Sequence, residues 1–405
     1  VAYAVLLLVA VYGSGLPDQA RSARDALLAA TGASAVAALG ISAVQLVTGD
    51  ALLPRFVVFG AALAVVPWSL ACWLLARGGR LRAEGRDRVV LVAAAPEAVV
   101  LGDELEGAPE RPAVLLNHLL VADCHPRPDR ARPLVELVTD IRANLVVLDR
   151  SALDDPVVVT QAASLHEDGV RVRTLSQFYD EWLGKFPMSE LERVSMFFDI
   201  SELHGGGGYG RWKRLLDVLL GAAAAVVFVL VVPLVLLGNV AGNRGPLLYR
   251  QERVGKGGRP FTMVKFRTMV PGAGDGDGSA GAWTQRDDPR ITRFGRLLRT
   301  THLDELPQGL NILRGDLSVV GPRPEQPHYV DELVAKIPFY DLRHLVRPGL
   351  TGWAQVKYGY AGDEQDAVEK LQYDFWYLRH QSLALDARIL GRTIRSTVGG
   401  AGAGR

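Results

Sequence analysis

The stretch VLLGAAAAVVFVLVVPLVLL, residues 218–237, decides how this chain is organised. It contains no charged side chain, and about 20 consecutive apolar residues are enough to cross the hydrocarbon core of a bilayer. The basic residues that flank this stretch are Arg211, Lys213 and Arg214 before it and Arg244 and Arg250 after it. Positive charge at both ends is typical of a membrane segment whose two ends both face the cytoplasm.

Pro233 lies near the far end of this run and allows two interpretations. A helix that simply spans the bilayer tolerates one proline. Alternatively, a re-entrant helix of about residues 213–240 enters one leaflet, bends where the proline removes a helix hydrogen bond, and returns. The residues alone leave both interpretations open.

Three further apolar runs open the sequence, at residues 1–11, 26–47 and 52–76. The second and third are long enough to span a bilayer, whereas the first is typical of a helix remnant with its start missing. We therefore expect transmembrane helices over residues 1–87. The arginines that follow the third run are Arg77, Arg80, Arg82, Arg86 and Arg88. They predict a multi-pass membrane protein with its soluble domains facing the cytoplasm.

Residues 88–203 have the pattern of a Rossmann-like parallel α/β domain, because short apolar runs alternate with helical or turn-rich spacers. The predicted strands lie at residues 89–92, 145–148, 157–159 and 170–173. The turn after the first strand is Ala93-Ala94-Ala95-Pro96, without the glycines that let backbone amides approach a pyrophosphate. We expect a degenerate domain that binds no nucleotide and serves regulation or homo-oligomer formation.

Composition agrees with membrane segments joined to soluble domains, since 49% of the residues are hydrophobic and 22% are charged. A net charge of +1 gives no indication of nucleic-acid binding. Cys72 and Cys124 support neither a disulfide framework nor a thiolate metal site. A glycine-rich linker at residues 204–210 marks the boundary of the last domain, residues 211–405.

The stretch THLDELPQ, residues 301–308, places Asp304 and Glu305 side by side just before Pro307. Proline suits the first turn of a helix, so the two carboxylates are expected at or just before a helix N-terminus. They are either acids that complement a helix dipole or part of a site that handles phosphate. Arg299 before them and Arg323 after them make the first interpretation incomplete, and the residues alone leave both open.

A β-hairpin is predicted upstream, from residues 248–252 and 262–267 joined by a Gly/Lys turn. Lys265 and Arg267 take alternate positions, so we expect both on one face, directed at a phosphate. A cationic hairpin also suits anionic lipid headgroups. Both interpretations hold together if a lipid-borne substrate brings its phosphate to this surface.

Phosphate chemistry gives these residues a coherent set of roles. A carboxylate can attack phosphorus and form an acyl phosphate, provided that cations neutralise the phosphate oxygens. Mg²⁺ is the expected cofactor, since it prefers carboxylate and phosphate oxygens and needs no dedicated protein cage.

The last domain resembles the polyprenyl-phosphate glycosyl-1-phosphate transferases, also called bacterial sugar transferases. The motifs that carry the resemblance are KRLLD at 213–217, YRQERVG at 249–255, KFRTM at 265–269, LDELPQ at 303–308 and RGDLSVVGPRPE at 314–325. The apolar run with Pro233 and residues 349–355 also match. The tail at 358–374 is similar to the exopolysaccharide-type subgroup, and the N-terminal part resembles the large members.

The resemblance implies transfer of a sugar-1-phosphate from a UDP-sugar to polyprenyl phosphate, with release of UMP. It implies that Asp304 is the nucleophile and the Mg²⁺-associated residue, and that Glu305 assists with proton handling at the lipid phosphate. Arg299 and Arg323 match phosphate-binding positions. The partners would be the two substrates and membrane lipid.

Two features depart from the family pattern or offer another interpretation. The re-entrant helix of the family bends at a Ser-Pro pair, whereas this chain has Val232-Pro233. Asp275-Gly276-Asp277 is the only short Asp-x-Asp signature of a soluble-sugar glycosyltransferase, and its Gly-rich surroundings indicate a linker. A catalytically silent membrane scaffold for polysaccharide assembly is the alternative function.

Overall fold

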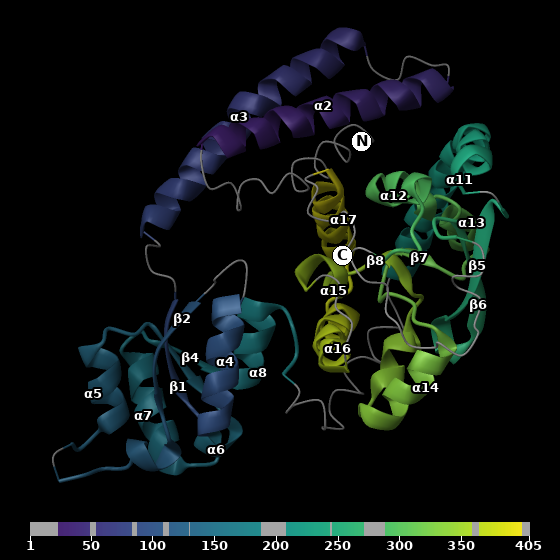
Figure 1. Cartoon of the computed structure of the whole chain (residues 1–405). Helices are drawn as coiled ribbons and strands as arrows, with labels where there is room; N and C mark the ends of the chain where they lie inside the picture. The colour runs from purple at the N-terminus through teal and green to yellow at the C-terminus, as the bar shows by residue number, and fades with distance from the viewer. Residues whose placement is uncertain are drawn as a thin grey trace. The chain divides into compact units, whose positions relative to one another are not determined.

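The computed structural model describes residues 23–48, 54–82, 87–107, 113–128, 130–187, 208–243, 245–270, 288–358 and 364–398. These fall into two compact units, Val1–Ala76 with Val194–Arg405, and Arg77–Arg193. Figure 1 shows the elements of each. Three sequence predictions lie outside the described residues: the helix remnant 1–11, most of the glycine linker 204–210, and Asp275-Gly276-Asp277.

The N-terminal helices α2 (Ala23–Thr48) and α3 (Arg55–Arg82) form where the sequence predicts helices. They pack through Ala37 and Ile41 of α2 and Val58 of α3, which are buried. Their continuous apolar parts, Leu27–Ser42 and Phe56–Ala71, are shorter than the roughly 20 residues that a span requires. The prediction that they cross the membrane therefore stays a prediction.

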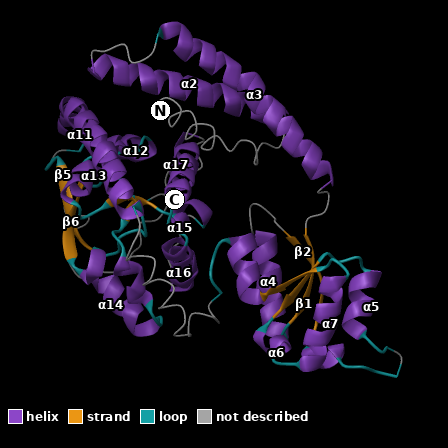
Figure 2. Ribbon diagram, turned by 180° about the vertical axis from the view of Figure 1, so that it is seen from behind, coloured by secondary structure: helices purple, strands orange, loops and turns teal. Residues whose placement is uncertain are grey.

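The unit Arg77–Arg193 is built on a four-stranded parallel sheet with the strand order β2-β1-β3-β4. Its strands are β1 (Asp87–Val92), β2 (Ala113–Leu119), β3 (Leu145–Leu148) and β4 (Arg171–Thr174). Its helices are α4 (Ala95–Gly107), η1 (Val121–Cys124), α5 (Pro133–Asp140), α6 (Arg150–Leu153), α7 (Pro156–Glu167), α8 (Leu175–Phe178) and η2 (Tyr179–Leu183). Figure 2 shows helices on both sides of the strands.

Successive residues of β1 bury their side chains on opposite faces of this sheet. Val89 and Leu91 belong to one hydrophobic cluster, with residues of α4 and α8. Val90 and Val92 belong to another, with residues of α5 and α7. A sheet covered on both faces explains why its strands are continuously apolar instead of alternating.

The predicted strand at residues 157–159 is wrong, because these three valines lie in α7. Asp155 caps this helix by accepting hydrogen bonds from the amides of Val157 and Val158, and Pro156 occupies its first turn. These start signals outweigh the β preference of consecutive valines. The sequence prediction missed the edge strand β2. Its side chains are neither all buried nor alternately buried, so its sequence has no regular strand pattern.

The turn after β1, which lacks glycines, is closed by an acidic side chain. The carboxylate of Asp149, at the end of β3, accepts hydrogen bonds from the amides of Ala94 and Ala152. In doubly wound sheets a ligand phosphate meets backbone amides at this position. An internal carboxylate therefore takes an amide that a nucleotide would need, which favours the prediction of a degenerate domain.

The C-terminal part, residues 208–398, begins with α11 (Tyr209–Gly242) and is mostly helical. Its other helices are α12 (Arg293–Thr300), α13 (Gln308–Arg314), α14 (Pro327–Lys336), α15 (Trp353–Lys357), α16 (Glu364–Arg379) and α17 (Leu383–Val398), with short turns η3 (Lys256–Gly258), η4 (Leu303–Glu305) and η5 (Tyr340–Leu345). The predicted hairpin is confirmed as the antiparallel pair β5 (Leu248–Val254) and β6 (Pro260–Phe266). Strands β7 (Ser318–Val320) and β8 (Gly349–Thr351) form a short parallel pair.

Helix α11 packs closely on this part along its length. Near its start, a Cβ on Gly221 would lie 3.0 Å from the Ile312 side chain of α13. Near its end, a Cβ on Gly238 would lie 2.2 Å from the Phe294 ring of α12. Glycine at both positions lets the neighbouring helices approach closely.

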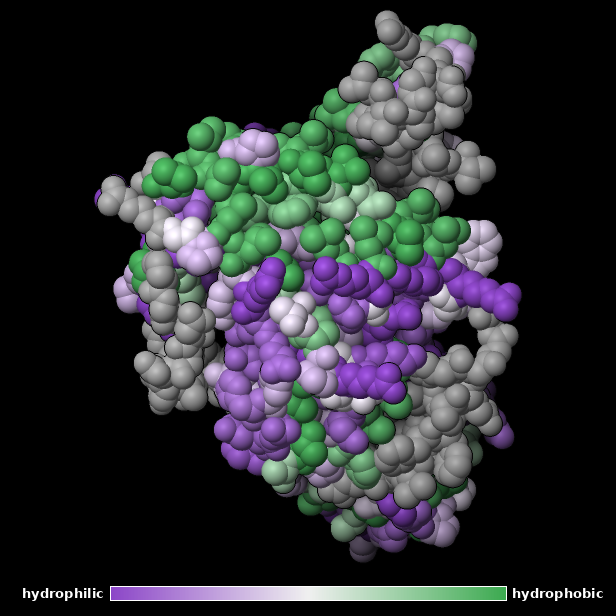
Figure 3. Space-filling view, turned by 90° about the vertical axis from the view of Figure 1, so that its right-hand side faces the viewer, coloured by the Kyte–Doolittle hydropathy of each residue, from purple (hydrophilic) through white to green (hydrophobic). Residues whose placement is uncertain are grey.

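The rest of the α11 surface is exposed and apolar. Leu219, Leu230 and Leu237 are between 57% and 72% exposed. Figure 3 shows a broad hydrophobic band bordered by hydrophilic surface on the face that includes this helix. Tyr209–Val240 is, by length and composition, the one helix of the described residues that could cross a membrane.

Candidate active site

Asp304 and Glu305 lie in η4, a single turn between α12 and α13. Thr292 caps α12 by accepting a hydrogen bond from the Gly295 amide, and α13 begins directly after Pro307. The sequence prediction that the carboxylates stand just before a helix is therefore confirmed. His302 precedes them in the left-handed conformation, with φ of 53°, and turns the chain sharply between the two elements.

Asp304 is a buried carboxyl group with a raised pKa. Burial and the neighbouring charge of Glu305 raise the pKa of Asp304 to about 6, although Lys265 and Arg299 act to lower it. Among the residues that the structure describes, Asp304 makes no ion pair. Its negative charge is therefore incompletely balanced by the protein, as expected of a group that meets a cation or an electrophile.

Glu305 differs from Asp304 because it has a direct cationic partner. Its Oε1 accepts a hydrogen bond from Lys265 Nζ at 3.0 Å. Burial acts to raise the pKa of Glu305, but Lys265 and Arg323 outweigh it and lower that pKa to about 2. Two adjacent carboxyl groups thus have pKa values on opposite sides of the usual range, which is a frequent property of catalytic pairs.

Five of the predicted site residues meet at this turn: the two carboxylates and three cationic side chains. Lys265 comes from β6, Arg299 from the last turn of α12 and Arg323 from the loop after β7. The charge of Arg299 acts to lower the pKa of Asp304, and the charge of Arg323 acts to lower the pKa of Glu305. Arg323 also lines a small cavity of about 20 Å³ together with Gln355.

Arg267 is placed elsewhere, contrary to the expectation that it shares a face with Lys265. Its guanidinium is buried and donates to the carbonyls of Pro246 and Asn243 and to Asn239 Oδ1. Strand β6 ends at Phe266, so the alternation of side chains no longer applies at Arg267. Arg267 instead satisfies carbonyls around the end of α11.

Pro233 lies inside α11, which continues as one helix from Tyr209 to Gly242. Its neighbour Val235 is buried against Phe266 and Leu298. The predicted bend at Pro233 stays a prediction, because a helix can continue through a proline with a kink.

The KRLLD motif has a structural role that the sequence did not reveal. Lys213 donates to the carbonyl of Val320 and to Asp386, and Arg214 donates to the last carbonyls of α13. Asp217 accepts hydrogen bonds from Ser318 Oγ and the Val319 amide. Lys213 and Asp217 lie four residues apart, which is the spacing of one side of a helix, but the partners of the three charges lie between 98 and 173 residues away along the chain.

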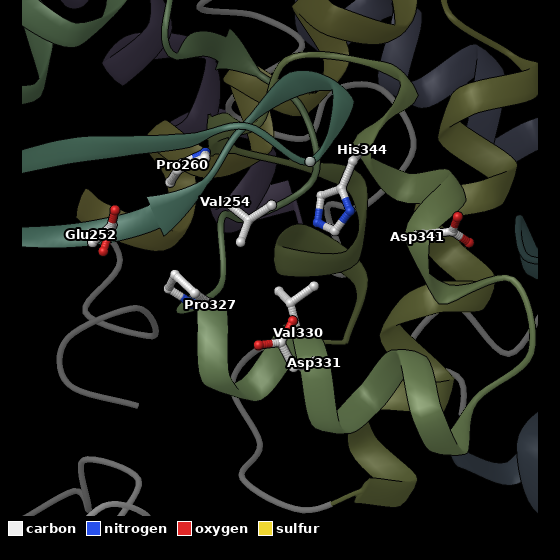
Figure 4. Close-up of a pocket in the computed structure, with 9 residues that line it drawn as sticks. Glu252, Val254, Pro260, Pro327, Val330, Asp331, Asp341 and His344 are labelled. Atoms are coloured by element: carbon white, nitrogen blue, oxygen red, sulfur yellow. The ribbon is translucent and has the colours of Figure 1, made fainter.

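A separate pocket of about 350 Å³ opens between the hairpin, α14 and η5. Figure 4 shows the His344 ring with Val254 and Val330 around it. Burial and the neighbouring Arg343 lower the pKa of His344 to about 4, so its ring is neutral at pH 7. Of the described residues, those that line this pocket include none of the predicted site residues.

The carboxylates of η4 suit Mg²⁺. This ion is typically held by one or two carboxylates together with substrate phosphates. Asp304, whose charge the protein leaves incompletely balanced, supplies one such ligand. In the described residues, no group of three or more acidic, His or Cys side chains is placed so that it could hold a metal ion, so the remaining ligands would come from substrate and water.

Known proteins resemble the part of the chain that carries these residues. Residues 209–400 match the model of the bacterial sugar transferase family. A UDP-N-acetylgalactosamine-undecaprenyl-phosphate N-acetylgalactosaminephosphotransferase of Aeromonas hydrophila is 43% identical over 198 residues, which are 48% of this chain and 45% of that protein.

Two further relatives are matched by this chain over a larger share of their length. A UDP-glucose:undecaprenyl-phosphate glucose-1-phosphate transferase of Caulobacter vibrioides is 45% identical over 45% of this chain and 68% of that protein. The sugar transferase EpsL of Bacillus subtilis is 38% identical over 46% of this chain and 87% of that protein. The matched region thus spans less than half of the Aeromonas relative but most of EpsL. The chain belongs to the bacterial sugar transferase family.

Proposed function

We propose that this protein transfers a sugar-1-phosphate from a UDP-sugar to polyprenyl phosphate, most simply undecaprenyl phosphate, and releases UMP. This is the initiating step in the synthesis of an exopolysaccharide, capsule or O-antigen. The observation that carries the proposal is the pair Asp304–Glu305, held between Lys265, Arg299 and Arg323. The same unit exposes the apolar helix α11, which suits a substrate that resides in the membrane.

Asp304 is the nucleophile in this proposal. One of its oxygens attacks the phosphorus that carries the sugar, and the bond from that phosphorus to the UMP oxygen breaks. The product is an aspartyl phosphosugar and free UMP. A phosphate oxygen of the polyprenyl phosphate then attacks the same phosphorus and releases Asp304. The form of Asp304 that reacts is the ionised carboxylate, which predominates above its pKa of about 6.

The surrounding cations neutralise the charge that accumulates during both attacks. Arg299 and Arg323 are proposed to bind the phosphate oxygens, since a guanidinium can donate two parallel hydrogen bonds to such a group. When bound at Asp304, Mg²⁺ would supply further neutralisation of the diphosphate. Glu305, with its pKa of about 2, stays a carboxylate at neutral pH and is suited to hold the Lys265 side chain in place. It is less suited to the proton transfer that the resemblance implies.

The proposed place of action is the cytoplasmic face of the bacterial inner membrane. Both ends of α11 are tied by polar groups to one compact unit, through Asp217 with Ser318 at the start and Asn243 with Arg267 at the end. A straight spanning helix of 34 residues would hold its two ends about 51 Å apart, at 1.5 Å per residue, on opposite sides of the membrane. We therefore propose that α11 enters and leaves the membrane on one side, and that α2 and α3 add membrane contacts.

The test is release of UMP by the full chain in membranes or detergent with undecaprenyl phosphate and a panel of UDP-sugars. UDP-glucose and UDP-N-acetylgalactosamine come first, as the sugars named for the relatives. We expect UMP from at least one sugar and none from Asp304→Asn, which keeps the shape of the side chain but cannot attack. Equal turnover by Asp304→Asn would refute the nucleophile assignment. Failure with every UDP-sugar would favour the scaffold alternative.

A further inference from the structure

Thr268 is a neighbour of the proposed active site, and it has no role among the site residues predicted from the sequence. It follows β6 by two residues and is 6% exposed. Its Oγ1 accepts a hydrogen bond from Arg299 Nε at 2.9 Å. Since Nε carries a single N–H, this bond constrains the plane of the guanidinium, and with it the direction in which Arg299 meets a phosphate.

The backbone of Thr268 is itself fixed by α12. Its carbonyl accepts a hydrogen bond from the Thr292 amide at 3.0 Å. A Cβ on Gly295 would lie 1.9 Å from the same carbonyl oxygen. Only glycine allows so close an approach, so Thr268 and the helix that carries Arg299 are held in one geometry.

The residue before Thr268 is anchored to the end of the apolar helix. Arg267 donates to Pro246 O at 2.7 Å and to Asn243 O at 3.1 Å. In return, Asn243 Nδ2 donates to Arg267 O at 2.8 Å. The dipeptide Arg267-Thr268 therefore joins α11 on one side to Arg299 on the other.

We propose that Thr268 is a positioning residue that orients the Arg299 guanidinium toward the diphosphate of the nucleotide sugar. Its position relative to the membrane is set by the bonds of Arg267 to the end of α11. The proposal rests on the proposed function, because it assigns a supporting residue to the same site. Hydrogen bonds of this kind hold catalytic groups within the narrow range of geometry that catalysis requires.

The test compares Thr268→Val, which keeps the shape but removes the acceptor, with Thr268→Ser, which keeps the hydroxyl. For Thr268→Val we expect KM for the UDP-sugar and its Kd to rise about tenfold, the effect of one charge-assisted hydrogen bond. Thr268→Ser should restore most of the affinity. Thr300→Val is the matched control, because Thr300 is an exposed α12 residue whose hydroxyl donates only to its own helix.

A double-mutant cycle separates orientation of Arg299 from a general loss of packing. In an Arg299→Lys background, which lacks the Nε donor, Thr268→Val should change Kd by less than about twofold. An equal tenfold effect in both backgrounds would overturn the proposal. So would a Thr268→Ser variant as weak as Thr268→Val.

Direct binding distinguishes failure of this inference from failure of the proposed function. The Kd is measured with UDP-glucose by calorimetry on the full chain carrying Asp304→Asn, which cannot take the phosphosugar, and needs no turnover. If UDP-glucose binds without UMP release and Thr268→Val weakens binding tenfold, the inference stands while the proposed reaction fails. If turnover is normal and Thr268→Val leaves KM and Kd unchanged, the inference alone fails. If UDP-glucose and the other UDP-sugars do not bind, both fail.

Discussion

At the scale of single residues, the site depends on an asymmetry between two adjacent carboxyl groups. Glu305 has Lys265 at hydrogen-bonding distance, whereas Asp304 is buried beside the charge of Glu305. The two residues are adjacent in the η4 turn, so their side chains point in different directions and meet different neighbours, and His302 enters this turn in the left-handed conformation. Histidine is among the few residues besides glycine that adopt this conformation readily.

The raised pKa of Asp304 predicts the pH dependence of UMP release. Activity should fall as the pH drops through about 6, because protonated Asp304 is not a nucleophile. Glu305→Gln removes a negative neighbour, so the acidic limb of its kcat/KM profile should move to lower pH. Lys265→Met removes a cation, so its limb should move to higher pH. Profiles of the wild type and both variants check this, and two shifts in the same direction would contradict it.

Arg267 and Arg299 should respond differently to the same substitution. Arg267→Met leaves buried carbonyls without their donor and should lower the free energy of unfolding by about 3 kcal/mol. Arg299→Met should leave Tm nearly unchanged but lower kcat/KM roughly a hundredfold, as loss of a group that stabilises developing charge does. Thermal unfolding in detergent and UMP release, measured on both variants, test the distinction. A stable, inactive Arg267→Met would restore the phosphate-binding role expected from the sequence.

At the scale of elements, α11 and the hairpin illustrate how much a local pattern conveys. The uncharged run of residues 218–237 predicts an apolar helix, and β-prone runs around a Gly/Lys turn predict an antiparallel pair; the structure contains both. The valines at 157–159 mislead, because Asp155 and Pro156 start a helix there. Start signals act on backbone groups directly, so they outweigh side-chain preference.

The proposed topology of α11 can be tested by labelling. Single cysteines at Arg211 and Arg250, in a background with Cys72 and Cys124 replaced by serine, lie on either side of the apolar run and are exposed. If both ends face the cytoplasm, a membrane-impermeant maleimide should label neither cysteine in intact cells and both after permeabilisation. Labelling of position 250 alone in intact cells would mean that α11 spans the membrane.

At the scale of the whole molecule, the chain combines two units with separate cores. The parallel sheet of Arg77–Arg193 has its own hydrophobic clusters on both faces. The family match covers residues 209–400, and EpsL is matched over 87% of its length by 193 residues of this chain. The family fold therefore does not require the preceding unit, for which regulation or homo-oligomer formation remains our expectation.

This organisation predicts that the segment 209–405 is sufficient for the reaction. Expressed alone in membranes, it should release UMP from the same UDP-sugar as the full chain, because every proposed site residue lies within it. Assays at equal protein concentration test this, with Asp304→Asn in the shortened chain as the control. Loss of activity in a segment that still folds and binds membranes would show that the preceding residues complete the site.

The sequence by itself determined the apolar helix, the hairpin, three of the four strands of the parallel sheet, and the position of Asp304 and Glu305 before α13. Each of these follows from hydrogen bonding and burial over a few neighbouring residues. Only the tertiary structure decided that Lys265 contacts Glu305, forty residues away, while Arg267 turns to the end of α11. A periodic pattern predicts side-chain direction only within its own element, and β6 ends at Phe266. Beyond that residue, the folded packing of distant elements sets which charges meet.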